Sequence, residues 1–234
     1  MRGLIEIAET MLSGASRRMD AAADNIANMT TPGFKSHVAF SAYVDSNSID
    51  ESGAVPASSL DMSDGKLVHT GNALDMAVSG DGFFVVRSGD KMFYTRDGQF
   101  KRSGDGHIVT ESGMILQTTA GDASVETGAF SVSGDGRINE LDKDLGQVAL
   151  VTFRDPAALQ PVSGGYFTAP ADSAEIVSAP RLVQGAVEQS NTSDATQMLA
   201  LMGALRGAES GQHIIQVYDD LLQQAAGVFG ARQA

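Results

Sequence analysis

Apolar residues recur every three or four positions at the beginning of the chain. They are Leu4, Ala8, Met11, Ala15, Met19, Ala22, Ile26 and Met29. Steps of three and four keep these side chains on one face of an α-helix, which predicts a helix over residues 2–29. Thr30-Thr31-Pro32-Gly33 then ends the helix, because proline cannot continue it and glycine tolerates a reversal of the chain.

A second apolar series lies near the other end of the chain. It consists of Met198, Leu201, Leu205, Ala208, Ile215, Tyr218, Leu222, Ala225 and Phe229. The series predicts a helix that starts near Ser193, a suitable N-cap, and runs to about Phe229. Neither helix can bury its apolar face alone. The simplest partner of each is the other, in a coiled-coil-like pair, and the next simplest is a neighbouring copy of the chain.

Three glycines, Gly203, Gly207 and Gly211, are spaced four apart on one face of the second predicted helix. Each costs roughly 1 kcal/mol of helix propensity relative to alanine. Such a line favours the close approach of a second backbone. The alternative is that a helix rich in alanine and glycine simply tolerates them.

The middle of the chain is typical of short strands and tight turns. The clearest strands are residues 83–86, 92–95, 114–116 and 148–153. Ser-Gly-Asp-Gly occurs at 79–82, 103–106 and 133–136, and Asp-Gly supplies the positive φ angles that hairpin turns need.

We therefore predict an α+β fold, with paired N- and C-terminal helices and a central antiparallel β-rich domain. The expected division is an N-terminal assembly helix (1–35), an extended connector (36–65), a β-rich domain (66–170), a return connector (171–192) and a C-terminal assembly helix (193–234).

Charge and composition exclude several classes of function. The net charge of -13 argues against a nucleic-acid partner, which needs a basic surface. The two ends are close to neutral and the acidity lies in the middle, which suits burial of the ends in an assembly. There is no cysteine, no apolar run long enough to span a membrane, and no pattern of a cleaved signal peptide.

Chemistry-bearing motifs are missing. The histidines are His37, His69, His107 and His213, and no two have metal-ligand spacing. The Gly-rich turns lack the Lys-Ser/Thr of a phosphate loop, and the acidic ladder of a calcium loop is also missing. We therefore expect no catalytic residue, metal, cofactor or small-molecule substrate.

Four sequence motifs together resemble those of bacterial flagellar rod and hook proteins. Residues 24–35 read Asp-Asn-Ile-Ala-Asn-Met-Thr-Thr-Pro-Gly-Phe-Lys, similar to the end of that family's N-terminal helix. Residues 70–86 and 94–100 are similar to its β domain, and residues 184–191 to the return into its C-terminal helix. The motifs occur in the family's order, and the chain is most similar to the proximal rod type, with distal rod and hook subunits as the alternatives.

The resemblance implies a structural subunit of the basal-body rod, the drive shaft that crosses the periplasm and transmits torque. Its partners would be copies of itself and other rod proteins, and the flagellar type III apparatus would export it without a cleaved signal peptide. Asn25 and Asn28 would cap or cross-link the end of the first helix, and Pro32-Gly33-Phe34 would turn the chain outward, with Phe34 as the anchor.

The residues expected at the assembly interface combine the two stripes, the glycine line and that turn. They are Leu4, Ala8, Met11, Ala15, Met19, Ala22, Asn25, Ile26, Asn28, Pro32, Gly33, Phe34, Gly203, Leu205, Gly207, Gly211, Ile215, Leu222 and Phe229.

Two other classes of function remain as alternatives. A helix-binding chaperone or scaffold would form one stable soluble complex through the same helices. An enzyme with an unrecognised site would keep its activity in the β domain alone. An assembly subunit instead needs both ends of the chain.

Overall fold

The computed structural model describes residues 2–38, 59–126, 130–141, 143–155 and 158–230, of which residues 2–4, 163, 171 and 225–230 are described by their backbone alone. The chain divides into two units. The first, the helical unit, contains both ends of the chain and residues 37–59 between them. The second, the β unit, contains residues 28–36 and 60–192.

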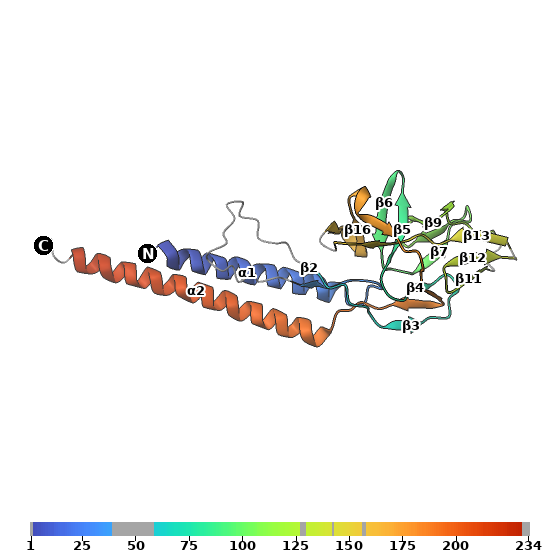
Figure 1. Cartoon of the computed structure of the whole chain (residues 1–234). Coiled ribbons are helices and arrows are strands. Elements are labelled where there is room, and N and C mark those ends of the chain that lie inside the picture. Colours follow the sequence, from blue (N-terminus) through green and yellow to red (C-terminus); the bar gives the residue numbers. More distant parts are fainter. Residues whose placement is uncertain (1, 39–58, 127–129, 142, 156–157, 231–234) are drawn as a thin grey trace. The chain divides into compact units, whose positions relative to one another are not determined.

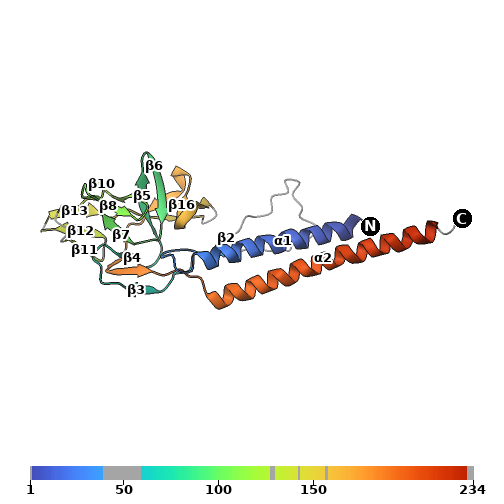
Figure 2. The same cartoon turned by 180° about the vertical axis from the view of Figure 1, so that it is seen from behind.

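The helical unit is a pair of antiparallel helices, α1 (Arg2–Ala27) and α2 (Asp194–Gly230). Figure 1 and Figure 2 show them side by side over the length of α1. The paired terminal helices expected from the two apolar stripes are therefore confirmed. Among the described residues, neither helix has the length and apolar content that crossing a membrane would require.

Short strands make up the β unit and its border with the helical unit. They are β1 (His37–Val38), β2 (Ser59–Leu60), β3 (Leu67–His69), β4 (Met76–Val78), β5 (Phe83–Ser88), β6 (Lys91–Thr95), β7 (Phe100–Arg102), β8 (Ile108–Thr110), β9 (Ile115–Thr118), β10 (Gly121–Asp122), β11 (Phe130–Val132), β12 (Arg137–Glu140), β13 (Lys143–Gln147), β14 (Leu150–Phe153), β15 (Gln160–Pro161), β16 (Tyr166–Thr168), β17 (Ala174–Ile176), β18 (Leu182–Gln184) and β19 (Ala186–Glu188).

One sheet dominates the β unit. Its main path is β15-β16-β6-β5-β9-β8-β7, with β14 also on β5, and every pairing with a determined register is antiparallel. Three smaller sheets accompany it: β11-β12-β13, β18-β4 and β19-β3. The predicted α+β class with an antiparallel β-rich centre is therefore confirmed.

Two apolar clusters form the core of the β unit. The larger includes Met76, Phe84, Ile108, Leu116 and Leu150, all at most 2% exposed. The smaller gathers aromatic residues, and Phe153 meets both Phe83 and Tyr94 edge to face. Phe84 of β5 belongs to the larger cluster and Phe83 to the smaller, so successive side chains of this strand pack on opposite faces and both faces are covered.

The Ser-Gly-Asp-Gly motifs act as turns. The last glycine of each, Gly82, Gly106 and Gly136, has a positive φ angle, which glycine adopts without steric cost. The motifs at 103–106 and 133–136 join paired strands, whereas the motif at 79–82 joins β4 to β5, which do not pair.

The expected connectors differ from the structure. Residues 171–192, predicted as a return connector, contain β17, β18 and β19 and belong to the β unit. These strands have three residues each, too short for a two-residue alternation to stand out from a turn. Of the 36–65 connector, β1 and β2 lie at its ends, and residues 39–58 lie outside the described residues.

Candidate functional site

Alanines line the buried face of α1. Ala8, Ala15 and Ala22 follow one another at intervals of seven and are at most 2% exposed. Ala204 and Gly211, also seven apart and buried, lie on α2. A repeat of seven keeps residues on one seam between two helices, and side chains this small let the backbones approach closely. We call these five residues and their half-buried neighbours the helix seam.

The glycine line faces α1 in part only. A Cβ atom added to Gly211 would lie 3.0 Å from Leu12 Cγ and 3.5 Å from the Ala8 carbonyl oxygen. A Cβ at Gly207 would meet the flexible end of Arg18 at 3.2 Å, and one at Gly203 would have no heavy atom within 4 Å. The three positions therefore differ in how much space α1 leaves them.

Asn25 joins three segments at one end of the helix seam. Its side-chain amide donates to the His37 carbonyl oxygen at 2.8 Å and to Gln197 Oε1 at 3.1 Å. Its Oδ1 accepts the His37 N–H at 2.7 Å. A buried polar residue with all these partners ties α1 to α2 and to β1, and favours one register of the seam. Burial lowers the pKa of the neighbouring His37, against a smaller opposing effect of Asp24.

Large apolar side chains lie on the opposite face of α2. Met198, Leu199, Met202 and Leu205 are between 45% and 67% exposed. At 3.6 residues per turn they are roughly opposite the line through Ala204 and Gly211. We call these four residues the outer face of α2. The helix pair thus buries small side chains and leaves large apolar ones exposed. In a complete hydrophobic core the large apolar side chains are the ones that are buried.

The predicted interface residues are distributed over several environments. Those buried in the helix seam are Ala8, Ala15, Ala22, Asn25 and Gly211. Those half-buried beside it are Met11, Met19, Ile26, Gly207 and Ile215. Those exposed are Gly203, Leu205 and Leu222, and those in the β unit are Asn28, Pro32, Gly33 and Phe34. The side chains of Leu4 and Phe229, and of Ala225 in the stripe, lie outside the described residues.

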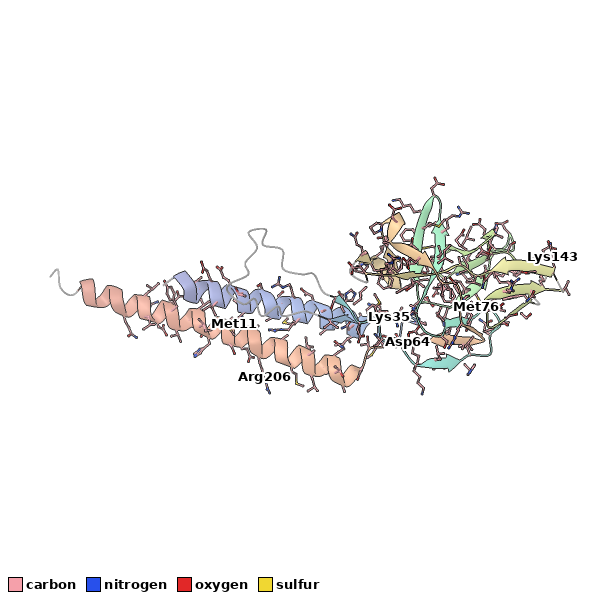
Figure 3. The ribbon with its side chains drawn as sticks, viewed as in Figure 1. Met11, Lys35, Asp64, Met76, Lys143 and Arg206 are labelled. Atoms are coloured by element: carbon pink, nitrogen blue, oxygen red, sulfur yellow. The ribbon has the colours of Figure 1, made fainter. Side chains whose placement is uncertain are left out.

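The apolar stripe predicted on α2 is displaced from its buried line. Met198, Leu205 and Leu222 belong to the predicted stripe but are exposed, whereas the buried Ala204 and Gly211 were assigned no place in it. For Met198 and Leu205 the reason is that residues 198–205 are all apolar, so that the largest side chains there do not mark the line facing α1. Figure 3 labels Met11 on α1 and Arg206 on α2, next to the exposed Leu205.

A tight turn follows α1. The N–H of Thr31 donates to the Asn28 carbonyl oxygen at 3.0 Å, and that of Phe34 donates to the Thr31 carbonyl oxygen at 3.3 Å. Gly33 has a φ angle of 67°, and a Cβ there would lie 2.2 Å from the Arg96 carbonyl carbon. No side chain fits at that position, so the turn requires glycine.

A buried ionic cluster lies directly after this turn. Lys35 Nζ donates to Glu188 Oε1 at 2.8 Å and to the Ser63 carbonyl oxygen at 2.7 Å. Arg96 Nη1 donates to Glu188 Oε2 at 3.2 Å and lies 3.7 Å from Asp64 Oδ1 at the rim. Lys35 and Glu188 are 1% exposed and Arg96 is 3% exposed. Figure 3 shows Lys35 and Asp64 in this region, which we call the ionic junction.

Further bonds surround Glu188. Its backbone carbonyl oxygen accepts the Gly33 N–H at 2.7 Å, and Oε1 also accepts the Gly65 N–H at 2.8 Å. A Cβ on Gly65 would lie 1.8 Å from the Gln189 carbonyl oxygen. The carboxylate therefore has two cations and an amide as donors, the compensation that a fully buried charge requires.

Asn191 binds the two ends of the β unit together. Its Oδ1 accepts the Ser36 N–H at 2.8 Å, and its amide donates to the Asp61 carbonyl oxygen at 2.8 Å. The Asn191 N–H also donates to the Phe34 carbonyl oxygen at 3.4 Å. The segment that follows α1 and the segment that precedes α2 are thus hydrogen-bonded to each other.

The four sequence motifs meet at the ionic junction. Arg96 lies over the Phe83 ring, 5.2 Å from its centroid, and the Met76 N–H donates to the Gly98 carbonyl oxygen at 2.9 Å. Residues far apart in the chain therefore share one contact network. Sequence reasoning missed it, although Lys35, Arg96 and Glu188 were visible as charges inside motifs that are otherwise mostly apolar or turn-forming.

Asp97 follows Arg96 of the ionic junction in the chain, and the pKa of its carboxyl is raised. Burial raises the pKa of its carboxyl to about 6, and the negative charges of Glu111 and Asp75 raise it further, while the Gln99 N–H bond opposes them. Among the described residues, no cluster of histidine or acidic side chains is arranged to hold a metal ion.

Two family models match the chain. Residues 5–35 match "Flagella basal body rod protein", and residues 77–140 match "Flagellar hook protein FlgE/F/G D1 domain". The first match covers most of α1 and the turn after it, and the second covers β5 to β9 and the hairpin that begins with β11.

Several curated relatives are similar to the chain. The flagellar basal-body rod protein FlgG of Bacillus subtilis (strain 168) is 30% identical over 88% of this chain and 91% of its own length. The flagellar basal-body rod protein FlgF of Mesorhizobium japonicum is 28% identical over 99% of this chain and 100% of its own length. The flagellar hook protein FlgE of Salmonella typhimurium is 37% identical, over 45% of this chain and 27% of its own length.

Proposed function

The chain belongs to the family of flagellar basal-body rod proteins, and from this premise we propose how it performs its structural role in the rod. As a subunit of that assembly, it polymerises through α1 and α2. The β unit is anchored at the end of α1 and the start of α2 by the turn at Gly33 and by Asn191.

The observation that carries this proposal is the distribution of apolar residues on the helix pair. The helix seam buries alanines and a glycine, while Met198, Leu199, Met202 and Leu205 are uncovered. Each of these side chains is already partly buried, and covering the remainder contributes about 1 kcal/mol per side chain, roughly half the value for full burial. A helix that leaves this much apolar area in water gains stability when a neighbouring subunit covers it, which is the physical requirement of polymerisation.

Its partners are other flagellar axial proteins and copies of the chain itself. We assign it to the proximal rod type, which the FlgF relative of Mesorhizobium japonicum supports, because that protein aligns with this chain over the full length of both. The chain then lies in the periplasm-spanning rod, is exported by the type III apparatus without a cleaved signal peptide, and has no catalytic role.

Deletion and complementation in the source bacterium test this function. Cells without the gene should lack complete basal bodies and motility, and the wild-type gene should restore both. A Leu199→Ser/Leu205→Ser variant should express but not enter basal bodies, because it makes the outer face of α2 polar. The matched control is Ile176→Ser, a similar change at a residue of the β unit that is 74% exposed.

Normal incorporation of the Leu199→Ser/Leu205→Ser variant would contradict polymerisation through this face. Complete basal bodies in the deletion strain would contradict the rod function itself. A single soluble complex with one partner, in place of incorporation, would favour a helix-binding chaperone.

A further inference from the structure

Three chain segments that are distant in sequence share one buried anion. Glu188 is 153 positions from Lys35 and 92 positions from Arg96, yet both cations donate to its carboxylate. Lys35 belongs to the segment that leaves α1, and Glu188 belongs to β19, just before α2. The ionic junction therefore connects the early and late parts of the β unit.

Docking of the early segment depends on the late one. The Gly33 N–H donates to the Glu188 carbonyl oxygen, the Ser36 N–H to Asn191 Oδ1, and the Lys35 ammonium to the Glu188 carboxylate. Without residues 182–191, Lys35 would have to enter the interior without an anion, and burial of an unpaired charge is strongly unfavourable. The segment 28–36 therefore does not dock stably on the β unit until β19 has formed.

The late segment also completes two early strands. β18 pairs with β4 and β19 pairs with β3, and among the described residues neither β3 nor β4 has another strand partner. By contrast, β5, β6, β8 and β9 pair with one another within residues 83–118. We call these four strands the inner sheet. Its contacts join residues that are close in sequence, and such contacts form before distant ones because closing a short loop costs less entropy.

We propose that Glu188 is a latch: the segments that connect the β unit to α1 and to α2 are fixed together, in one step that follows formation of the inner sheet. Before residues 182–191 dock, the β unit is only partly folded and the segment 28–36 is not bound to it. Because Lys35 and Arg96 both donate to the Glu188 carboxylate, the two dockings are conditional on each other. The latch is independent of the rod assignment, because it concerns folding of the β unit alone.

Native-state hydrogen exchange on the full-length Glu188→Gln chain tests the coupling. Glutamine keeps the shape of the side chain but leaves Lys35 buried without an anion and Arg96 with only Asp64, at 3.7 Å. Exchange at the amides of Gly33, Ser36 and Gln189 should accelerate together by about 100-fold to 5,000-fold, the range expected from the loss of one partner of a buried ion pair. Amides of β5 and β6 should keep their wild-type rates.

The matched control is Glu175→Gln, which removes a surface carboxylate paired with Arg154 and should change none of these rates. Wild-type protection at Gly33 and Ser36 in Glu188→Gln would overturn the proposal. Equal loss of protection throughout the β unit would also overturn it, because Glu188 would then be an ordinary stabilising residue.

Pulse-labelled refolding of the wild-type chain gives a second test that needs no variant. The amides of β5 and β6 should gain protection in a first phase, and those of Gly33, Gly185 and Gln189 in a common later phase. Protection of Gly33 in the first phase, or before Gln189, would contradict the latch.

Discussion

Small residues set the distance between α1 and α2. Gly211 has the Leu12 side chain and the Ala8 backbone within 3.5 Å of where its Cβ would be, whereas Gly203 has free space. Two glycines of one helix, eight positions apart, therefore have opposite physical consequences. Their spacing was visible in the sequence, but which of them faces α1 depends on the rotation of α2, which the uninterrupted apolar run of residues 198–205 does not reveal.

Leucine substitutions separate these two positions. Gly203→Leu and Gly211→Leu both gain about 0.8 kcal/mol of helix propensity. Gly211→Leu also overpacks the seam against Leu12, at a cost of about 1–3 kcal/mol. Far-ultraviolet circular dichroism of the isolated chain should show higher helix content for Gly203→Leu and lower content for Gly211→Leu. Gly207→Leu should fall between them, because the end of Arg18 can move. Equal helix content in all three would contradict the described seam.

Asp97 predicts a pH-dependent contribution to stability. Burial raises its pKa in the folded chain to about 6, from the ordinary value of 3.8, so the folded state binds the proton more tightly than the unfolded state. Its contribution therefore favours folding below pH 3.8 and is lost as the pH rises through about 6. The change amounts to at most about 3 kcal/mol.

Asp97→Asn removes this titration and preserves an oxygen that can accept the Gln99 N–H. Urea unfolding at pH 4 and pH 7 should show that the variant is more stable than the wild type at pH 7 and gains little at pH 4. Comparison of the two chains is necessary because hydrogen bonds lower the pKa of Asp122 and Asp144, which act in the opposite direction. An identical pH dependence in both chains would disprove the assignment to Asp97.

At the scale of elements, long periodic segments were predictable and short strands were not. α1 and α2 follow directly from steps of three and four, because tens of residues repeat one pattern. β17, β18 and β19 contain three residues each, and β18 and β19 depend on partners, β4 and β3, that are more than a hundred positions away. The ionic junction was unpredictable for the same reason, since no local pattern indicates that Lys35 meets Glu188.

The helix pair should be the least stable element of the isolated chain. Its seam buries alanines and Gly211, and each alanine contributes little apolar area. In a dilute solution of the full-length chain, amides of α1 and α2 should exchange rapidly, while amides of β5, β6 and β9 stay protected. Hydrogen exchange with mass spectrometry measures this difference. Similar protection in the helices and in the sheet would mean that the seam suffices by itself and that no neighbour is needed.

At the scale of the whole molecule, the two units have separate physical tasks. The β unit has two apolar clusters, aromatic contacts and a buried ionic junction, so it holds its own fold. The helical unit leaves Met198, Leu199, Met202 and Leu205 exposed, and these are the side chains that neighbouring subunits would cover in the proposed assembly.

A density map of the intact basal body, with side chains assigned along the rod, tests the central claim most directly. At one level of the rod, the map should fit this sequence, with α1 and α2 paired along Ala8, Ala15 and Ala22. The outer face of α2 should be covered by neighbouring subunits. Absence of the chain from every level, or an outer face of α2 that stays in contact with solvent there, would contradict the account.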